Sequence, residues 1–199
     1  MSLEHILLGM LREPASGYDL KAAFNEGARH FWSAELSQIY PTLQKMEQRG
    51  WLKSRREPSV RGPDRRVYRR TAKGTEALRE WLDAGPVLGT ERFAYIGQII
   101  FMGELDDLEA TEQFTRQLRD RLDEFRRLLE GAEVDLRRRL DFPDGLDEHE
   151  FHSLLSLRIG IRSLRAKVAA CDDNLELIRS RIKRANTKNA RVKKEVTHA

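Results

Sequence analysis

The sequence of 199 residues contains a single cysteine, Cys171. One thiol cannot form an intrachain disulfide and cannot supply a cysteine-based zinc site, so the fold does not depend on an oxidising compartment. Long hydrophobic runs are also missing, because no apolar stretch approaches the roughly 20 residues of a membrane-spanning helix. Residues 2–12 lack the basic start and the long apolar centre of a secretory signal. We therefore expect a cytoplasmic globular protein.

Catalytic and cofactor-binding motifs are absent as well. The sequence has no glycine-rich phosphate loop and no nucleophile elbow, and Cys171 has no clear histidine partner. His149 and His152 are three residues apart, which can place two metal ligands on one helix face, but no third ligand is evident. We therefore expect that the protein is not an enzyme and uses no metal or cofactor.

Positive charge is present and gathers in two places. The net charge is only +4, from 36 basic and 32 acidic residues, so it indicates no particular partner by itself. Residues 49–73, however, contain only Glu57 and Asp64 as acids. The basic residues of that segment are Arg49, Lys53, Arg55, Arg56, Arg61, Arg65, Arg66, Arg69, Arg70 and Lys73. A second basic run covers residues 179–194. Such runs are often only solvated faces, so the neighbouring elements decide their meaning.

The N-terminal part alternates helical patterns with a short β pattern. Apolar spacing, capping residues and breakers predict helices over residues 3–13, 16–27, 36–50 and 71–82, and strands over residues 51–57 and 65–71. Ser16 and Asp19 form a capping box for the second helix, and Thr71 caps the fourth. Three helices, a basic hairpin and a further helix make a winged helix-turn-helix.

The third helix, in the stretch SQIYPTLQKMEQRGW, has two faces. Ile39, Leu43 and Met46 form an apolar row, whereas Gln38, Thr42, Lys45 and Arg49 form a row of hydrogen-bonding and basic side chains. Pro41 disturbs a helix least near its start, so the helix is expected to begin at Leu36 or Ser37. The first turns then carry Ser37, Gln38, Tyr40 and Thr42, where a recognition helix meets base edges and phosphates. Tyr40 has equal claims to a place in the core.

The C-terminal part is helical throughout. Residues 91–103 form an apolar helix, and residues 112–140 form a long amphipathic one. Beyond a break at residues 141–148, apolar residues alternate spacings of three and four without error and form one narrow seam. The seam consists of Leu154, Leu157, Ile161, Leu164, Val168, Cys171, Leu175, Ile178 and Ile182. It predicts a helical partner, either the preceding long helix of the same chain or, in addition, a second copy of the chain.

Several N-terminal motifs resemble the PadR family of transcriptional regulators. They are Gly17-Tyr18-Asp19-Leu20, Phe31-Trp32-Ser33, Gln38-Ile39-Tyr40-Pro41-Thr42-Leu43 with Met46-Glu47 and Gly50, and Arg66, Tyr68, Thr71 and Lys73-Gly74. The resemblance covers residue 3 to about residue 82. In length and pattern the C-terminal part is similar to the helical dimerisation domain of the longer members, such as the phenolic-acid-responsive repressor and the virulence activator AphA.

The resemblance implies a mainly α fold with a small β-hairpin wing, in which a winged helix-turn-helix (1–85) precedes an antiparallel long-helix, coiled-coil dimerisation domain (90–185). Residues 186–199 would be a basic, disordered tail. The resemblance also implies a homodimeric repressor that binds a palindromic operator of double-stranded DNA. Gln38, Thr42 and Lys45 would read this operator, and Arg61, Arg65 and Arg66 of the wing would contact the DNA backbone or the minor groove. The dimer would use Leu154, Leu157, Ile161, Leu164, Val168, Leu175 and Ile178.

Two further readings follow. Some members of the family bind small aromatic or other hydrophobic effectors between their two domains, and Phe93, Ile96, Ile100 and Phe101 lie where such a cavity would form. The same residues also suit an ordinary core. The other reading is a protein-interaction module, in which the coiled-coil domain recruits a partner and DNA binding is secondary.

Overall fold

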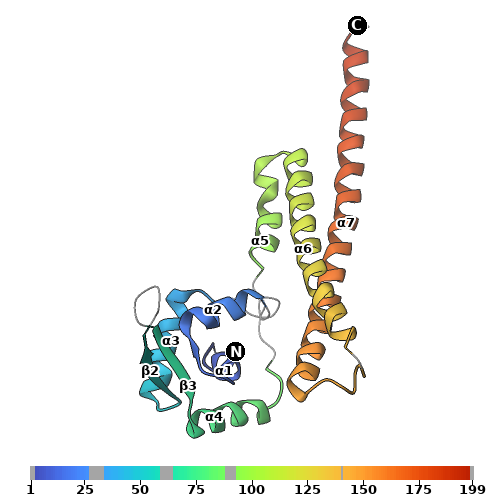
Figure 1. Ribbon diagram of the computed structural model, residues 1–199. Helices are drawn as coiled ribbons and strands as arrows, with labels where there is room; N and C mark the ends of the chain where they lie inside the picture. The colour runs from blue at the N-terminus through green and yellow to red at the C-terminus, as the bar shows by residue number, and fades with distance from the viewer. Residues whose placement is uncertain (1–2, 27–33, 59–64, 88–92, 140, 198–199) are drawn as a thin grey trace. The chain divides into compact units, whose positions relative to one another are not determined.

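The computed structural model describes residues 3–26, 34–58, 65–87, 93–139 and 141–197, with side chains described as far as Thr187. The chain divides into two compact units, Met1–Glu91 and Arg92–Ala199 (Figure 1). The predicted domain limits of 1–85 and 90–185 remain predictions. None of the helices in these ranges combines the length and the apolar character that a membrane span would require.

The first unit begins with three helices, α1 (Leu3–Met10), α2 (Gly17–Glu26) and α3 (Leu36–Gln48). The capping box predicted before α2 is present, because the Ser16 amide donates to the Asp19 carboxylate at 2.9 Å and the Asp19 amide donates to the Ser16 hydroxyl at 3.2 Å. The start of α3 at Leu36 is as predicted. The three helices enclose a core in which Leu7, Phe24 and Leu43 are at most 1% exposed.

A three-stranded antiparallel sheet in the order β1-β3-β2 packs on the helices. The strands of the predicted hairpin are β2 (Leu52–Glu57) and β3 (Arg65–Arg70). The sequence did not predict β1 (Ala15–Ser16), a strand too short to produce an alternating pattern, which pairs with Val67 and Tyr68 of β3. One face of the sheet turns Leu52 and Tyr68 into the helical core, where each is 1% exposed.

Helix α4 (Ala72–Asp83) closes the first unit. As predicted, Thr71 caps it, because the hydroxyl oxygen accepts the Gly74 amide at 3.1 Å. The same hydroxyl lies 2.8 Å from the Gly50 carbonyl oxygen and 3.0 Å from that of Trp51. The start of α4 is therefore tied to the turn between α3 and β2.

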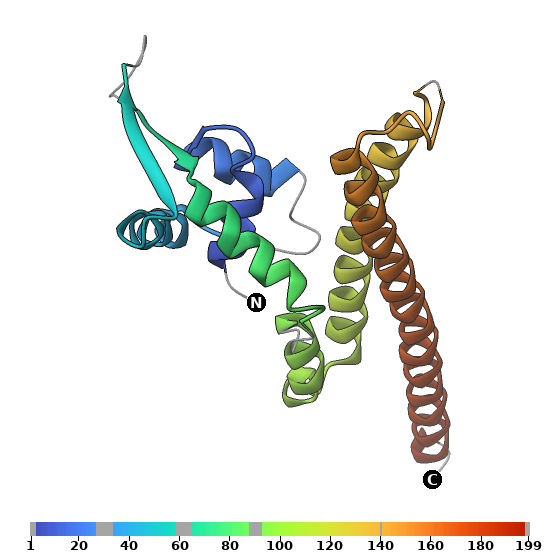
Figure 2. The same cartoon turned by 90° about the horizontal axis from the view of Figure 1, so that it is seen from below.

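The second unit consists of α5 (Ala94–Phe101), the 3-10 helix η2 (Met102–Leu105), α6 (Leu108–Arg137) and α7 (Glu148–Thr197). Helices α6 and α7 run antiparallel and lie side by side in two views (Figures 1 and 2). Ion pairs join them across the interface, including Glu112–Arg179 at 2.9 Å, Arg119–Asp172 at 3.0 Å and Glu130–Arg165 at 2.7 Å. Helix α7 continues to Thr197, so its backbone is helical through most of the segment expected to be a disordered tail.

The apolar seam of α7 packs on α6 of the same chain. Leu157, Ile161 and Leu164 form one core cluster with Leu129, packed against Leu122 and Phe125. Every seam residue from Leu154 to Leu175 is at most 8% exposed within the single chain. Of the two partners that the seam allows, the structure therefore realises the intramolecular one.

Candidate nucleic-acid interface

The start of α3 is fixed by a reciprocal capping box. The Glu35 side chain accepts a backbone amide of the first turn, and the Gln38 side-chain oxygen accepts the Glu35 amide at 3.1 Å. Gln38 is exposed, but its amide oxygen is already engaged in holding the helix end. The amide group of Gln38 is therefore the part that faces solvent as a donor.

Pro41 lies in the second turn of α3, as expected for a helix that begins at Leu36. A residue at this position would donate its amide to the Ser37 carbonyl, and proline cannot. The hydroxyl of the next residue, Thr42, donates to the Gln38 carbonyl oxygen at 2.7 Å, so it does not replace the missing bond to Ser37. Thr42 is half-buried and its hydroxyl hydrogen is occupied, so it retains only acceptor capacity for DNA.

The solvent face of α3 is fixed by the burial of Ile39, Leu43 and Met46, each of which is 0% exposed. Ser37 and Lys45 are exposed as expected. Tyr40 is 42% exposed, and its ring lies against Gly17 of α2, where an added Cβ would come within 2.6 Å of it. Tyr40 therefore belongs partly to the core and partly to the surface: one side of its ring packs against α2 and the other side is open to solvent.

Two glutamines on this face escaped the sequence reasoning. Gln44 and Gln48 are exposed, and at helical spacing they lie opposite the buried row. Glutamine can hydrogen-bond an adenine edge in the major groove. The spacing of Ile39, Leu43 and Met46 identifies the buried face, and the residues opposite that face could have been read from it. The sequence analysis chose instead the row of Gln38, Thr42, Lys45 and Arg49, which lies on the flank of the helix.

Arg49 does not project freely from α3. Its guanidinium pairs with Glu4 of α1 at 2.7 Å and lies over the Trp51 ring, 5.3 Å from the ring centroid. The sequence prediction of a DNA reader at Arg49 assumed a free cation, and a partner 45 residues away cannot be seen from local spacing. Lys45, in contrast, makes no ion pair within the described residues.

The arginines of the wing are paired with acids of the first unit. Arg66 contacts Glu47 of α3 at 2.5 Å and the Ser54 hydroxyl at 2.8 Å, which ties the hairpin to the recognition helix. Arg65 lies 3.2 Å from Glu57 and 3.9 Å from Asp19. These two side chains therefore hold the wing in place, a role that the sequence prediction did not include. Arg61, the third predicted wing residue, lies outside the described residues.

Other cations of the sheet carry more available charge. Lys53 and Arg69 are exposed and lie directly opposite each other in the β2–β3 ladder. Like charges in that position repel unless an anion lies between them. Arg56 is exposed beside Arg66. Within the described residues Lys53, Arg56 and Arg69 make no ion pair, so they add to the basic surface that the hairpin presents.

Local hydrogen bonds and charge favour the ionised form of Asp19 near the interface. Hydrogen bonds from the Ser16 amide and hydroxyl, with a smaller contribution from the Arg65 charge, lower the pKa of Asp19. Burial raises the pKa of Tyr68, whose hydroxyl therefore stays protonated at neutral pH.

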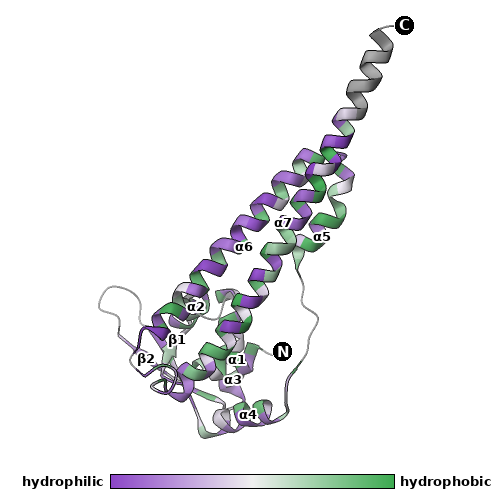
Figure 3. Ribbon diagram, turned by 90° about the vertical axis from the view of Figure 1, so that its right-hand side faces the viewer, coloured by the Kyte–Doolittle hydropathy of each residue, from purple (hydrophilic) through white to green (hydrophobic). Residues whose placement is uncertain are grey.

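Of the residues predicted for an effector, Ile96, Ile100 and Phe101 lie on α5 and Phe93 immediately precedes it. Ile96, Ile100 and Phe101 are 47%, 70% and 68% exposed, and α5 has no buried residue. Phe93 packs beside Tyr95, and the Lys167 ammonium lies 4.2 Å from the Phe93 ring centroid. Figure 3 shows the mainly hydrophobic colour of α5. Within the second unit Ile96, Ile100 and Phe101 form an open apolar face and not an enclosed cavity.

Comparison with known proteins gives a consistent picture. A model of the transcriptional regulator PadR-like family matches residues 6–80. The negative transcriptional regulator PadR of Bacillus subtilis is 33% identical over 121 residues, which cover 60% of this chain and 66% of that protein. The crystal structure of Bacillus subtilis PadR in complex with operator DNA matches 88% of this chain and 98% of its own, with a TM-score of 0.69 at 25% identity. The structure of the Vibrio cholerae virulence activator AphA matches 90% and 99%, with a TM-score of 0.61 at 25% identity.

Proposed function

Because the chain belongs to the PadR-like family of transcriptional regulators, we propose that it is a homodimeric repressor that binds a palindromic operator and is released by a small hydrophobic or aromatic effector. The proposal places it in the cytoplasm, where bacterial relatives meet their DNA. Repression is the choice because the Bacillus subtilis relative is a negative regulator. The winged helix-turn-helix, confirmed in the first unit, is the part that would bind the operator.

The observation that carries the DNA-binding proposal is the free, exposed cation on α3. Lys45 lies on the solvent side of a helix whose opposite side is fully buried, and it makes no ion pair within the described residues. Ser37, Gln38, Gln44 and Gln48 surround it with hydrogen-bonding groups. Such a surface can donate and accept at base edges in the major groove, while the lysine neutralises a phosphate or contacts guanine.

The wing would add sequence-independent affinity. Lys53, Arg56 and Arg69 supply cations without acidic partners within the described residues. Arg65 would exchange part of its contact with Asp19, at 3.9 Å, for a phosphate. Arg66 and Glu47 would stay together and fix the angle between the hairpin and α3. Each phosphate neutralised in this way releases counterions and makes binding weaken steeply with salt.

The homodimer is supported by apolar surface that a single chain leaves open. Ile96, Ile100, Phe101 and Leu105 on α5 and η2 are 47% to 70% exposed. A second open row, Phe151, Leu155 and Ile159, is 41% to 72% exposed on the first turns of α7. In a two-fold dimer each row on one chain can cover the other row on its partner. The seam residues Leu154 to Leu175 would then contribute to the interface only indirectly, because they already pack within the chain.

A salt-titrated mobility-shift assay tests the proposal, with DNA from upstream of the protein's own gene and random DNA as competitor. Specific complexes that weaken steeply as salt rises are the expected result. Equal affinity for random DNA, together with no enriched site after selection from a genomic library, would refute sequence-specific binding and would favour the interaction-module alternative.

A further inference from the structure

The second unit contains a small hollow between α5, the start of α6 and the middle of α7. Its volume is about 290 Å³, and Ile99, Leu108 and Ile178 give it an apolar lining. This volume lies at the lower end of the range for small-ligand pockets. Leu177 at its rim is 69% exposed, so a ligand could cover apolar surface that is now in water.

The polar groups of the hollow are few and lie on two sides. On α6, the Thr115 hydroxyl is buried and donates to the Thr111 carbonyl oxygen at 2.8 Å, and the Thr111 hydroxyl donates to the Asp107 carbonyl oxygen at 3.0 Å. Both hydroxyl hydrogens are thus used within the helix. On α7, Asn174 and Arg181 are exposed and supply donors. The α6 side of the hollow therefore stays neutral, and the α7 side is cationic.

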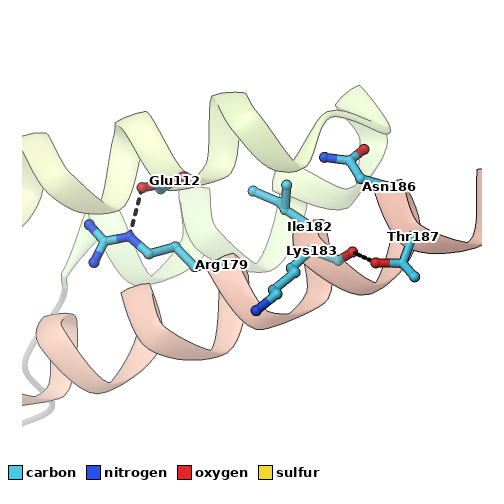
Figure 4. A pocket seen from close by; sticks show the side chains of 6 residues that line it. All are labelled: Glu112, Arg179, Ile182, Lys183, Asn186 and Thr187. Carbon is cyan, nitrogen blue, oxygen red and sulfur yellow. Dashed lines mark hydrogen bonds and ion pairs between the residues drawn. The ribbon is translucent and has the colours of Figure 1, made fainter. Parts of the chain in front are cut away.

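Arg181 differs from the other arginines that line the α6–α7 interface. Arg179 pairs with Glu112 at 2.9 Å, and Arg158 and Arg165 pair with Glu133 and Glu130. Figure 4 shows the Arg179–Glu112 pair at the edge of a larger hollow of about 590 Å³, where the arginine is already neutralised. Arg181 has no acidic partner within the described residues. A guanidinium without a carboxylate, at the mouth of an apolar hollow, is the arrangement that recognises a carboxylate ligand.

We infer that this hollow binds a small amphipathic monocarboxylate, whose short apolar body lies among Ile99, Leu108 and Ile178 and whose carboxylate pairs with Arg181. The hollow has room for a chain of a few carbons and has one unpaired positive charge to match one negative charge. The binding of such a ligand does not depend on the proposed function. Only its use as an effector that changes operator affinity rests on that proposal.

Isothermal titration calorimetry with hexanoate, acetate and hexan-1-ol on the full chain tests the binding. Hexanoate should bind more tightly than acetate by about fourfold for each additional buried methylene, from the usual transfer free energy of that group. Arg181→Gln should weaken hexanoate about tenfold or more, as expected for loss of a charge-assisted pair, and should leave hexan-1-ol unchanged. Arg184→Gln is the matched control, because Arg184 is an exposed arginine on the same helix that contacts Ser180 and does not line the hollow.

Methyl NMR locates the bound ligand. The Ile99, Leu108 and Ile178 signals should shift with hexanoate, whereas Leu129 in the centre of the α6–α7 core should not. Hexanoate affinity that is equal in the wild type and Arg181→Gln, or shifts confined to other methyl groups, would overturn the assignment.

The operator assay separates this site from the proposed function. Hexanoate that binds in the hollow and lowers operator affinity in the wild type, but not in Arg181→Gln, supports the effector role. Operator binding that is absent without any ligand would count against the proposed function and leave the hexanoate result standing.

Discussion

The two basic side chains Lys45 and Arg49, at α3 and its C-cap, differ in whether they form an ion pair with an acidic residue. Arg49 is paired with Glu4 at 2.7 Å, whereas Lys45, four residues earlier, is exposed and has no ion pair within the described part of the chain. A paired arginine is already partly neutralised by its carboxylate, so it brings less net positive charge to a phosphate than an unpaired lysine does. We therefore propose that Lys45 makes the larger contribution to DNA binding.

Replacement of Lys45 with alanine should lower operator affinity without changing the fold or the dimer. If Lys45 contacts a phosphate, the slope of log affinity against log salt should fall in magnitude by about 1. Fluorescence anisotropy across a salt series measures both quantities. Arg162→Ala, which removes one exposed charge from α7 in the second unit, is the control. An operator affinity and salt slope that match the wild type would remove Lys45 from the reading surface.

Two glycines make a matched pair for stability. A Cβ at Gly74 would lie 2.2 Å from the Trp51 carbonyl oxygen, where the start of α4 meets the backbone before β2, whereas a Cβ at Gly9 in α1 would meet nothing within 4 Å. Gly74→Ala should therefore destabilise the first unit by roughly 1–3 kcal/mol through overpacking. Gly9→Ala should stabilise it by roughly 0.5–1 kcal/mol, because alanine is the better helix former. Chemical denaturation followed by tryptophan fluorescence reports this unit, since Trp32, Trp51 and Trp81 all belong to it. Equal stability of the two variants would contradict the close approach at Gly74.

At the scale of whole elements, the sequence predicted the helices, hairpin and caps of the first unit well. Those features depend on local signals: the spacing of Ile39 and Leu43, the Ser16–Asp19 box and the Thr71 cap. What it missed depends on contacts between distant segments. The pairing of Arg49 with Glu4 and the two-residue strand β1 are examples, because neither leaves a periodic trace.

The seam of α7 shows a different limit of prediction. Alternating spacings of three and four indicate that the seam packs against another helix, and this prediction is confirmed by α6. An intramolecular helix and a second chain impose the same pattern, however, so the choice between them was not in the sequence. The candidate effector residues met the same difficulty, since the spacing of Ile96 and Ile100 is equally suited to a core, a cavity or an interface.

The exposed face of α5 gives a prediction at this scale. Ile100→Lys should weaken the dimer and leave each chain folded, because Ile100 is 70% exposed in the single chain. Leu164→Ala should instead destabilise the α6–α7 pair by roughly 2–5 kcal/mol, the cost of a cavity in a packed core. Analytical ultracentrifugation and circular dichroism separate the two effects. Gln117→Lys, an exposed position on α6, is the control for added charge. A dimer that resists Ile100→Lys would remove α5 from the interface.

Low pH should lower the stability of the second unit, because its ion-paired carboxylates become protonated. A hydrogen bond from Arg179 lowers the pKa of Glu112, one from Arg126 lowers the pKa of Asp123, and one from Arg165 lowers the pKa of Glu130. A carboxyl whose pKa is lower in the folded state stabilises the fold above its unfolded pKa, which is about 4. That contribution is lost as the pH falls through the lowered folded values.

The pH prediction is checked by thermal unfolding followed by far-ultraviolet circular dichroism from neutral pH to below pH 4. The helix-rich second unit should melt at a lower temperature in acid, and Glu130→Gln should reduce the difference, because that variant lacks one titrating group. A melting temperature of the second unit that stays constant over this range would show that the ion pairs contribute nothing to stability.

At the scale of the whole molecule, the two units divide the work of a regulator. The first unit presents α3 and a basic hairpin, and the second presents apolar surface suited to another copy of the chain. A two-fold dimer places two recognition helices on one face of DNA, and the half-sites of a palindrome must then be about one helical turn, roughly 34 Å, apart. In the proposed regulator, the dimer and the operator spacing would both follow from this two-fold symmetry.

The most direct test of this claim is the binding of purified protein to a selected operator in which the distance between the half-sites is varied, with the mass of each complex measured by sedimentation. We predict one dimer per operator, with affinity strongly reduced when about half a turn of DNA is inserted and the second half-site rotates to the far side of the duplex. Single chains bound independently to each half-site, with an affinity that does not depend on the spacing, would contradict the proposed dimeric regulator.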